Sequence, residues 1–146
     1  MRLYTFTNAN YLKEIQCGIQ TAHVVHSLFN RYAEREQDLK LVETAHLWNW
    51  SKHYKTIIIL DGGNCENLHN IYSAIMPLAE ECSFPYVCFH EDKASLNDAI
   101  TCVGVILPAS VYEPPITSLD AYLKLLPSPL TTADKLYNLI RSYRLA

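Results

Sequence analysis

Apolar residues recur at intervals of three and four positions from Ile15 onward, which is the period of one α-helical face. This face predicts a helix that ends near Glu36 and packs its apolar side on a sheet. Its members are Ile15, Ile19, Ala22, His26, Phe29 and Ala33. The start of the helix, IQCGIQTAHVVH, also carries two glutamines and two histidines. These polar side chains are either satisfied at the edge of the helix or form the floor of a site.

Four other segments have the composition of β-strands: residues 3–7, 55–63, 85–90 and 100–107. The second of them, KTIIILDGG, contains a continuous apolar run and predicts a central strand buried on both faces. The last contains Gly104, which marks a point where a neighbouring element approaches closely.

Two further helices are predicted, over 39–50 and 64–83. Asn64 is a suitable cap for the second, and Pro77 is expected to kink that helix or end it early. The elements therefore follow the order β-α-α-β-α-β-β, which is typical of an α/β layer with a mixed sheet. The last two strands are joined by about ten polar residues, so we expect them to pair antiparallel.

The composition changes after Pro108, where a proline-rich connection precedes two short helical patterns with caps at Ser118 and Thr132. The fold prediction is a single α/β domain with a small mixed four-stranded sheet flanked by helices and a C-terminal helical extension. The α/β part spans residues 1–108. Residues 109–146 form the connection and the appendage, which is too short to build a core of its own.

The net charge of −3 argues against a broad nucleic-acid footprint, because proteins that bind phosphates are usually basic. A local basic patch remains compatible with the sequence, since several cations fall in one stretch: Arg31, Arg35, Lys40, Lys52 and Lys55. The five cysteines form no CxxC pair, which argues against a zinc site or a disulfide framework. No apolar run approaches the ~20 residues of a membrane span. We expect a cytoplasmic protein without a cofactor.

Gln20 and His23 are three residues apart and share a helix face. Near a helix start, a glutamine amide can orient a water or a carbonyl, and a histidine can act as base or donor. The alternative is that both are helix residues bonded to the backbone. His23 and His26 have the spacing of metal ligands, but no nearby carboxylate completes a set, so no metal site is predicted.

Two loops contain further candidates. LDGGN (60–64) joins a strand to a helix, where backbone amides can hold a phosphate, although it lacks the P-loop residues and a plain turn also explains it. HEDKASLNDAIT (90–101) gathers acidic residues and Thr101 between two paired strands. A carboxylate beside a hydroxyl can position a hydrolytic water, and a polar loop without chemistry is the alternative.

The segment GIQTAHVV resembles the first-helix motif of the type II peptidyl-tRNA hydrolase family, in which a His follows a Gln by three residues. Gln20, Ala22 and His23 match that motif. The similarity to the family extends over about residues 1–108. It includes the element order, the tryptophans before the isoleucine-rich strand, and TCVGVILP (101–108) as the closing strand. The family's Lys four residues before the Gln is replaced by Gln16, and Lys13 is out of register. These departures indicate a divergent branch, such as a phage version.

The resemblance implies an esterase that cleaves the bond between a peptide and the tRNA 3′ ribose. Gln20 would position the water or carbonyl, Glu91 or Asp92 would act as base or orienter, and Thr101 would support the oxyanion. The residues expected at the substrate are Gln16, His23 and Lys13. A basic stripe of Arg31, Arg35, Lys52 and Lys55 would favour tRNA.

A second hypothesis is a catalytically inactive binding protein of the same fold, which holds a nucleotide-like small ligand or a partner protein. The lost Lys, the acidic charge and the added C-terminal helices favour it. A homodimer is compatible with either hypothesis. Fold alone does not decide between them.

Overall fold

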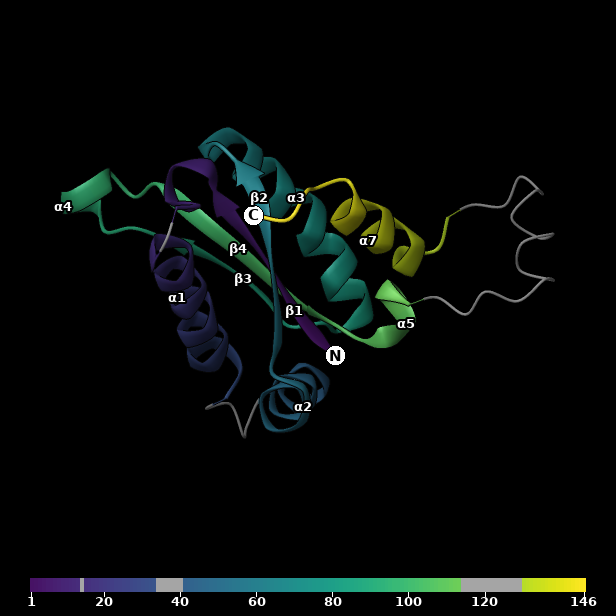
Figure 1. The fold of residues 1–146 in the computed structure, drawn as a ribbon. Helices are drawn as coiled ribbons and strands as arrows, with labels where there is room; N and C mark the ends of the chain where they lie inside the picture. Colours follow the sequence, from purple (N-terminus) through teal and green to yellow (C-terminus); the bar gives the residue numbers. More distant parts are fainter. Residues whose placement is uncertain (14, 34–40, 114–129) are drawn as a thin grey trace.

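The computed structural model describes residues 1–13, 15–33, 41–113 and 130–146, and shows one four-stranded sheet with the order β2-β1-β4-β3 (Figure 1). The strands are β1 (Arg2–Asn8), β2 (Thr56–Gly63), β3 (Tyr86–His90) and β4 (Ile100–Leu107). β1 and β2 are parallel, whereas β4 runs antiparallel to both β1 and β3. The predicted small mixed sheet in a single α/β domain is confirmed, and so is the antiparallel pairing of the last two strands.

Helices cover both faces of the sheet (Figure 1). One face carries α1 (Ile15–Tyr32) and α2 (Leu41–Asn49), which is followed by the π-helical turn η2 (Trp50–Tyr54). The other carries α3 (Cys65–Cys82), α5 (Ala109–Tyr112) and α7 (Thr132–Arg141). Two short helices lie at the sheet ends, η1 (Ala9–Tyr11) and α4 (Lys93–Leu96).

The hydrophobic core is divided by the sheet into two clusters, because side chains alternate between the faces of each strand. On the α3 face, Phe6, Val103 and Leu107 pack with side chains of α3 and α7. On the α1 face, Leu3 and Ile106 pack with Val24, Leu28, Tyr32, Leu47 and Trp50. Gly104 lies on the second face, and a Cβ at this position would be 2.3 Å from Cγ1 of Val24. The close approach predicted at this glycine is therefore present.

The isoleucine-rich strand β2 lies at the edge of the sheet, so the prediction of a central, doubly buried strand is wrong. Ile57 is 39% exposed. The C-terminal residues cover part of the outer edge of β2, since the amide of Asp61 donates to the carbonyl of Arg144 at 3.0 Å. The amide of Ala146 likewise donates to the carbonyl of Ile59 at 3.0 Å. An apolar run shows that a segment is hydrophobic, but strand order depends on distant partners.

Helix α3 continues through Pro77 to Cys82, so the prediction of an early end is wrong. Proline has no amide hydrogen, so Pro77 leaves the carbonyl of Ser73, four residues earlier, without its helical partner. Both residues are exposed, and water can therefore satisfy this carbonyl. The predicted cap is confirmed, because Oδ1 of Asn64 accepts from the amide of Asn67 at 2.9 Å.

The C-terminal extension contributes to the core through Leu136 and Ile140 of α7, which are buried against the α3 face. Its cap is Thr131, one residue before the predicted Thr132. The other predicted helix, with its cap at Ser118, lies outside the described residues. The division of the chain after residue 108 stays a prediction.

Helix α1 turns a different face to the sheet from the one predicted. Its buried residues are Gln20, Thr21, Val24, Leu28 and Tyr32. By contrast, Ile15 is 72% exposed and Ile19 is 39% exposed. The helix ends at Tyr32, before the predicted end near Glu36, and residues 34–36 lie outside the described residues. Much of the predicted apolar face is thus exposed to solvent.

Candidate functional site

The predicted site residues lie at one end of the sheet. β1 and β3 are both antiparallel to β4, so the carboxyl ends of β1 and β3 lie beside the start of β4. Ligands of open α/β sheets commonly bind at the carboxyl ends of strands. Helix α1 also begins at this end, after the short helix η1 that follows β1. The topology therefore brings Gln20, Glu91 and Thr101 to the same place.

A continuous chain of hydrogen bonds joins these three side chains. The hydroxyl of Thr101 donates to Oε1 of Gln20 at 2.7 Å. Nε2 of Gln20 in turn donates to Oε1 of Glu91 at 2.9 Å. Gln20 is only 2% exposed and Thr101 only 1%, whereas Glu91 is half-buried. The two bonds fix the orientation of the Gln20 amide and aim its donor at a carboxylate that solvent can reach.

An irregularity in β4 places Thr101 in this chain. Phe89 of β3 pairs with Cys102, but the next residue, His90, pairs with Ile100. Thr101 is the extra residue, as in a β-bulge. Ile100 belongs to the core on the α3 face and Cys102 to the core on the α1 face. The bulge allows Thr101 to face α1 as Cys102 does, and its hydroxyl then reaches Gln20.

The neighbouring carboxylate, Asp92, has a different local role. Its Oδ1 accepts from the amide of Ala94 at 2.7 Å, at the start of α4. The sequence left open whether Glu91 or Asp92 is the carboxylate of the site. The carboxylate that accepts from the Gln20 amide is Glu91, so the geometry favours Glu91.

The three residues expected at the substrate lie around this chain. His23 stacks face to face on Phe89, with ring centroids 4.2 Å apart and planes at 5°. The carbonyl of Lys13 accepts from the amide of Gln16 at 3.2 Å, and both of these side chains are exposed. His23 thus packs α1 against β3, while Lys13 and Gln16 remain at the surface where α1 begins.

The sequence does not predict Tyr11 as a site residue; it lies in η1, shortly after Asn8, the last residue of β1. Burial, and then the negative charge of Glu91, raise the pKa of Tyr11, which places its phenol within the electrostatic reach of the carboxylate. Asn8 is 2% exposed, and its Nδ2 donates to Sγ of Cys65 at 3.4 Å. The position of Tyr11 shortly after a strand is a signal for residues near a site.

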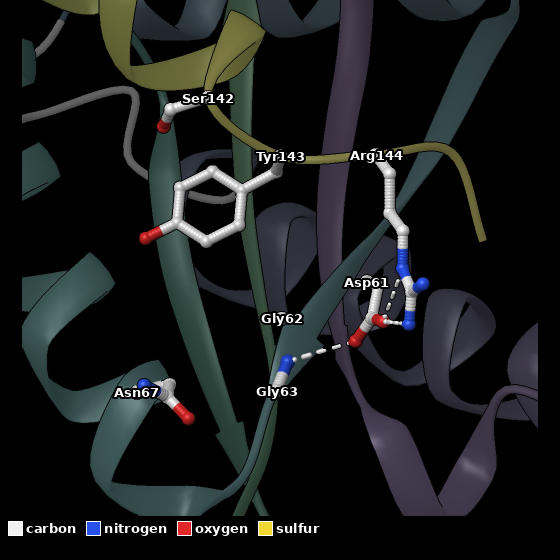
Figure 2. Close-up of a pocket in the computed structure, with 7 residues that line it drawn as sticks. All are labelled: Asp61, Gly62, Gly63, Asn67, Ser142, Tyr143 and Arg144. Carbon is white, nitrogen blue, oxygen red and sulfur yellow. Dashed lines mark hydrogen bonds and ion pairs between the residues drawn. The ribbon is translucent and has the colours of Figure 1, made fainter.

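A separate open pocket of about 380 Å³ lies at the end of β2 (Figure 2). It contains none of the predicted catalytic residues. Its lining comes from the end of β2, the start of α3 and the C-terminal residues: Asp61, Gly62, Gly63, Asn67, Ser142, Tyr143 and Arg144. The amide of Gly63 donates to Oδ1 of Asp61, and the amide of Asn64 to Oδ1 of Asn67, each at 3.0 Å. These internal bonds favour the plain-turn interpretation of LDGGN over a phosphate site.

The ion pair on this pocket gives a testable electrostatic prediction. Arg144 donates two hydrogen bonds to Oδ2 of Asp61, at 2.8 and 3.0 Å (Figure 2). These bonds, followed by the bond from the Gly63 amide, lower the pKa of Asp61. We expect Arg144→Met to raise this pKa toward the ordinary aspartate value, as measured by NMR titration of the side-chain carboxyl carbon.

The lowered pKa of Asp61 also makes the stability of the fold depend on pH. A depressed carboxyl pKa stabilises the fold above the unfolded pKa, about 3.9, and this contribution is lost as pH falls through the folded pKa. The wild type should therefore lose more stability than Arg144→Met between about pH 5 and the folded pKa. An unchanged Asp61 titration in the variant would show that the ion pair does not determine this pKa.

The cations of the predicted stripe lie away from Gln20. Arg31 donates to the carbonyl and the hydroxyl of Tyr86, each at 3.3 Å, at the start of β3. Lys52 and Lys55 lie just before the start of β2. These positions are at the amino ends of β2 and β3, opposite the end that holds Gln20. Arg35 and Lys40 lie outside the described residues.

No protein-family model matches the sequence, and no curated protein matches it either. In the described part of the chain, no helix is long and apolar enough to cross a membrane. Within the same residues, no group of three or more His, Cys, Asp or Glu side chains is arranged to hold a metal ion.

Proposed function

We propose that this protein hydrolyses an ester of the peptidyl-tRNA type, between a peptide's C-terminal carbonyl and the 3′ ribose. The observation that carries the proposal is the hydrogen-bond chain from Thr101 through Gln20 to Glu91. Further support comes from the resemblance of GIQTAHVV to the type II peptidyl-tRNA hydrolase motif. The order of strands and helices also agrees with what that resemblance implies.

In the proposed mechanism, Glu91 is the general base. Gln20 holds one carboxylate oxygen, and the other oxygen accepts a proton from a water that attacks the ester carbonyl. The ester C–O bond then breaks, and the proton passes from Glu91 to the ribose oxygen that leaves. The products are a free 3′ hydroxyl and a peptide carboxylic acid, which releases the second proton of the water to solvent and becomes a carboxylate. Water supplies both the oxygen of the new carboxylate and the proton of the hydroxyl.

Thr101 acts here as a positioning residue rather than as the oxyanion donor expected from the sequence. Its hydroxyl proton is directed to Gln20, and the residue is 1% exposed. In this proposal, the oxyanion is stabilised by groups at the start of α1, such as backbone amides. Gln16 stands where the family has a Lys, and loss of one such donor typically costs about 10²-fold or more in rate. We accordingly expect slow turnover.

The second candidate is a binding protein of the same fold. The observation that favours it is the position of Arg31, Lys52 and Lys55, which lie at the opposite end of the sheet from Gln20. The net charge of −3 also favours a binding protein over a tRNA hydrolase. Such a protein would hold a nucleotide-like small ligand or a partner protein without turnover.

Release of an N-blocked aminoacyl group from tRNA by the purified protein tests the proposal, with Gln20→Ala as the matched variant. We expect turnover by the wild type and a loss of at least about 10²-fold in the variant, because Glu91 loses its orienting bond. A thermal melt must show that the variant is folded, since Thr101 and Glu91 lose a buried partner. Absence of turnover by folded wild type would overturn the proposal. Thermal stabilisation by a nucleotide without turnover would support the second candidate.

A further inference from the structure

Helix α1 exposes the residues that a surface helix normally buries. Ile15 is 72% exposed and Ile19 is 39% exposed, while Gln20 and Thr21 of the same helix are buried. Ile15 in particular leaves most of its apolar surface in water, where burial would stabilise the fold. Departures of this kind from the expected pattern concentrate at binding surfaces and functional sites.

Helix geometry places this exposed row next to the proposed site. Ile15 and Ile19 are four residues apart and follow one line along the helix. His23 continues that line by one more turn, and its ring stacks on Phe89 of β3 at 4.2 Å. Phe89 is two residues before Glu91. The row therefore begins at the exposed start of α1 and ends against the strand that presents the carboxylate.

The charge of the helix restricts what this row can contact. Residues 15–30 contain no Asp, Glu, Lys or Arg. The substrate of the proposed function has two halves of opposite character: a nucleotide half that carries phosphates, and an acyl half whose side chain is often apolar. An uncharged row with two exposed isoleucines complements the acyl half rather than the phosphates.

We propose that Ile15 and Ile19 form the contact surface for the acyl half of the substrate, and that they favour a large apolar C-terminal side chain. This inference rests on the proposed function and specifies the substrate class of the same site. The ester carbonyl has to lie within reach of Glu91, so the side chain next to that carbonyl lies over the adjacent start of α1. Burial of an apolar side chain against the isoleucines then increases kcat/KM for that substrate.

The test compares two substrates, N-acetyl-leucyl-tRNA and N-acetyl-glycyl-tRNA, with the wild type and with Ile15→Ser/Ile19→Ser. We expect kcat/KM for the leucyl substrate to fall about tenfold in the double variant. The glycyl substrate, which has no side chain to contact the row, should change by less than about twofold. The control is Leu41→Ser in α2, which removes an apolar residue about as exposed (70%) as Ile15 (72%) and should leave kcat/KM for both substrates unchanged. Thermal melts of all variants should agree with the wild type, because the altered side chains are exposed.

The outcomes separate this inference from the function on which it rests. Equal loss on both substrates would overturn the acyl contact, since it would show a general effect on the site. Unchanged rates on both would overturn it as well, while turnover itself would leave the hydrolase proposal standing. Absence of turnover of either substrate by folded wild type would overturn the proposed function and this inference together.

Discussion

Replacement of Glu91 by Gln is expected to lower kcat/KM for ester hydrolysis by about 10²- to 10⁴-fold while the protein stays folded. The side chain keeps its size, and its amide oxygen can still accept the 2.9 Å bond from Gln20. It can no longer take a proton from water, because an amide is not a base near neutral pH. The substitution therefore removes the general base and preserves the packing. A steady-state assay measures the loss of activity, and a thermal melt of the same preparation shows whether the protein is folded.

Asp92→Asn is the matched control for this experiment. Asp92 is adjacent in sequence and is also a carboxylate, but it accepts from the amide of Ala94 at the start of α4, whereas Glu91 accepts from Gln20. The loss of one negative charge is the same in both variants. We expect Asp92→Asn to retain activity within about twofold, consistent with the small effect of most surface substitutions. Similar losses in both variants would mean that the effect is electrostatic and general, contrary to a specific role for Glu91.

A second large effect is expected on stability, from Gly104→Ala. A Cβ at this position would lie 2.3 Å from Cγ1 of Val24, in the buried layer between α1 and the sheet. Helix α1 then has to move away or Val24 has to leave its preferred rotamer, which typically costs about 1–3 kcal/mol. The free energy of unfolding, measured by urea denaturation, should fall by about this amount.

Val24→Ala provides the internal check on that explanation. Alone, it leaves a void and should destabilise the protein by about 2 kcal/mol. It also removes the carbon atom that the methyl group introduced by Gly104→Ala would meet. The double variant should therefore be more stable than the sum of the single effects by at least about 1 kcal/mol. Additive effects would show that the strain of Gly104→Ala does not arise at Val24.

Much of the fold was predictable, because it depends on local periodicity. The strand and helix order, the cap at Asn64 and the close approach at Gly104 all followed from short patterns. The edge position of β2 was not predictable, since strand order depends on pairing between distant segments. The prediction that Pro77 ends the helix early was wrong because the effect of a proline depends on its exposure, which the sequence does not specify.

The sequence predicts Gln20, Thr101 and a carboxylate at 91 or 92 as site residues. The structure joins Thr101, Gln20 and Glu91 in one hydrogen-bonded chain, and their roles in catalysis stay a prediction. The bonds join residues 81 and 71 positions apart, so no local pattern contains them. The hydrophobic pattern predicts Ile19 in the core, and it leaves open whether Gln20 lies at the edge of the helix or in the floor of a site. The structure instead exposes Ile19 and buries Gln20, which is stable because the buried amide has partners at both ends.

The most direct test of the hydrolytic role of the Thr101–Gln20–Glu91 chain is a single-turnover reaction in water enriched in oxygen-18. The substrate is N-acetyl-leucyl-tRNA, and mass spectrometry of both products locates the label. If Glu91 is the general base, we expect one labelled oxygen in the carboxylate of N-acetyl-leucine, unlabelled tRNA, and no release above background with Glu91→Gln. Label in the ribose, or equal release by wild type and Glu91→Gln, would contradict it.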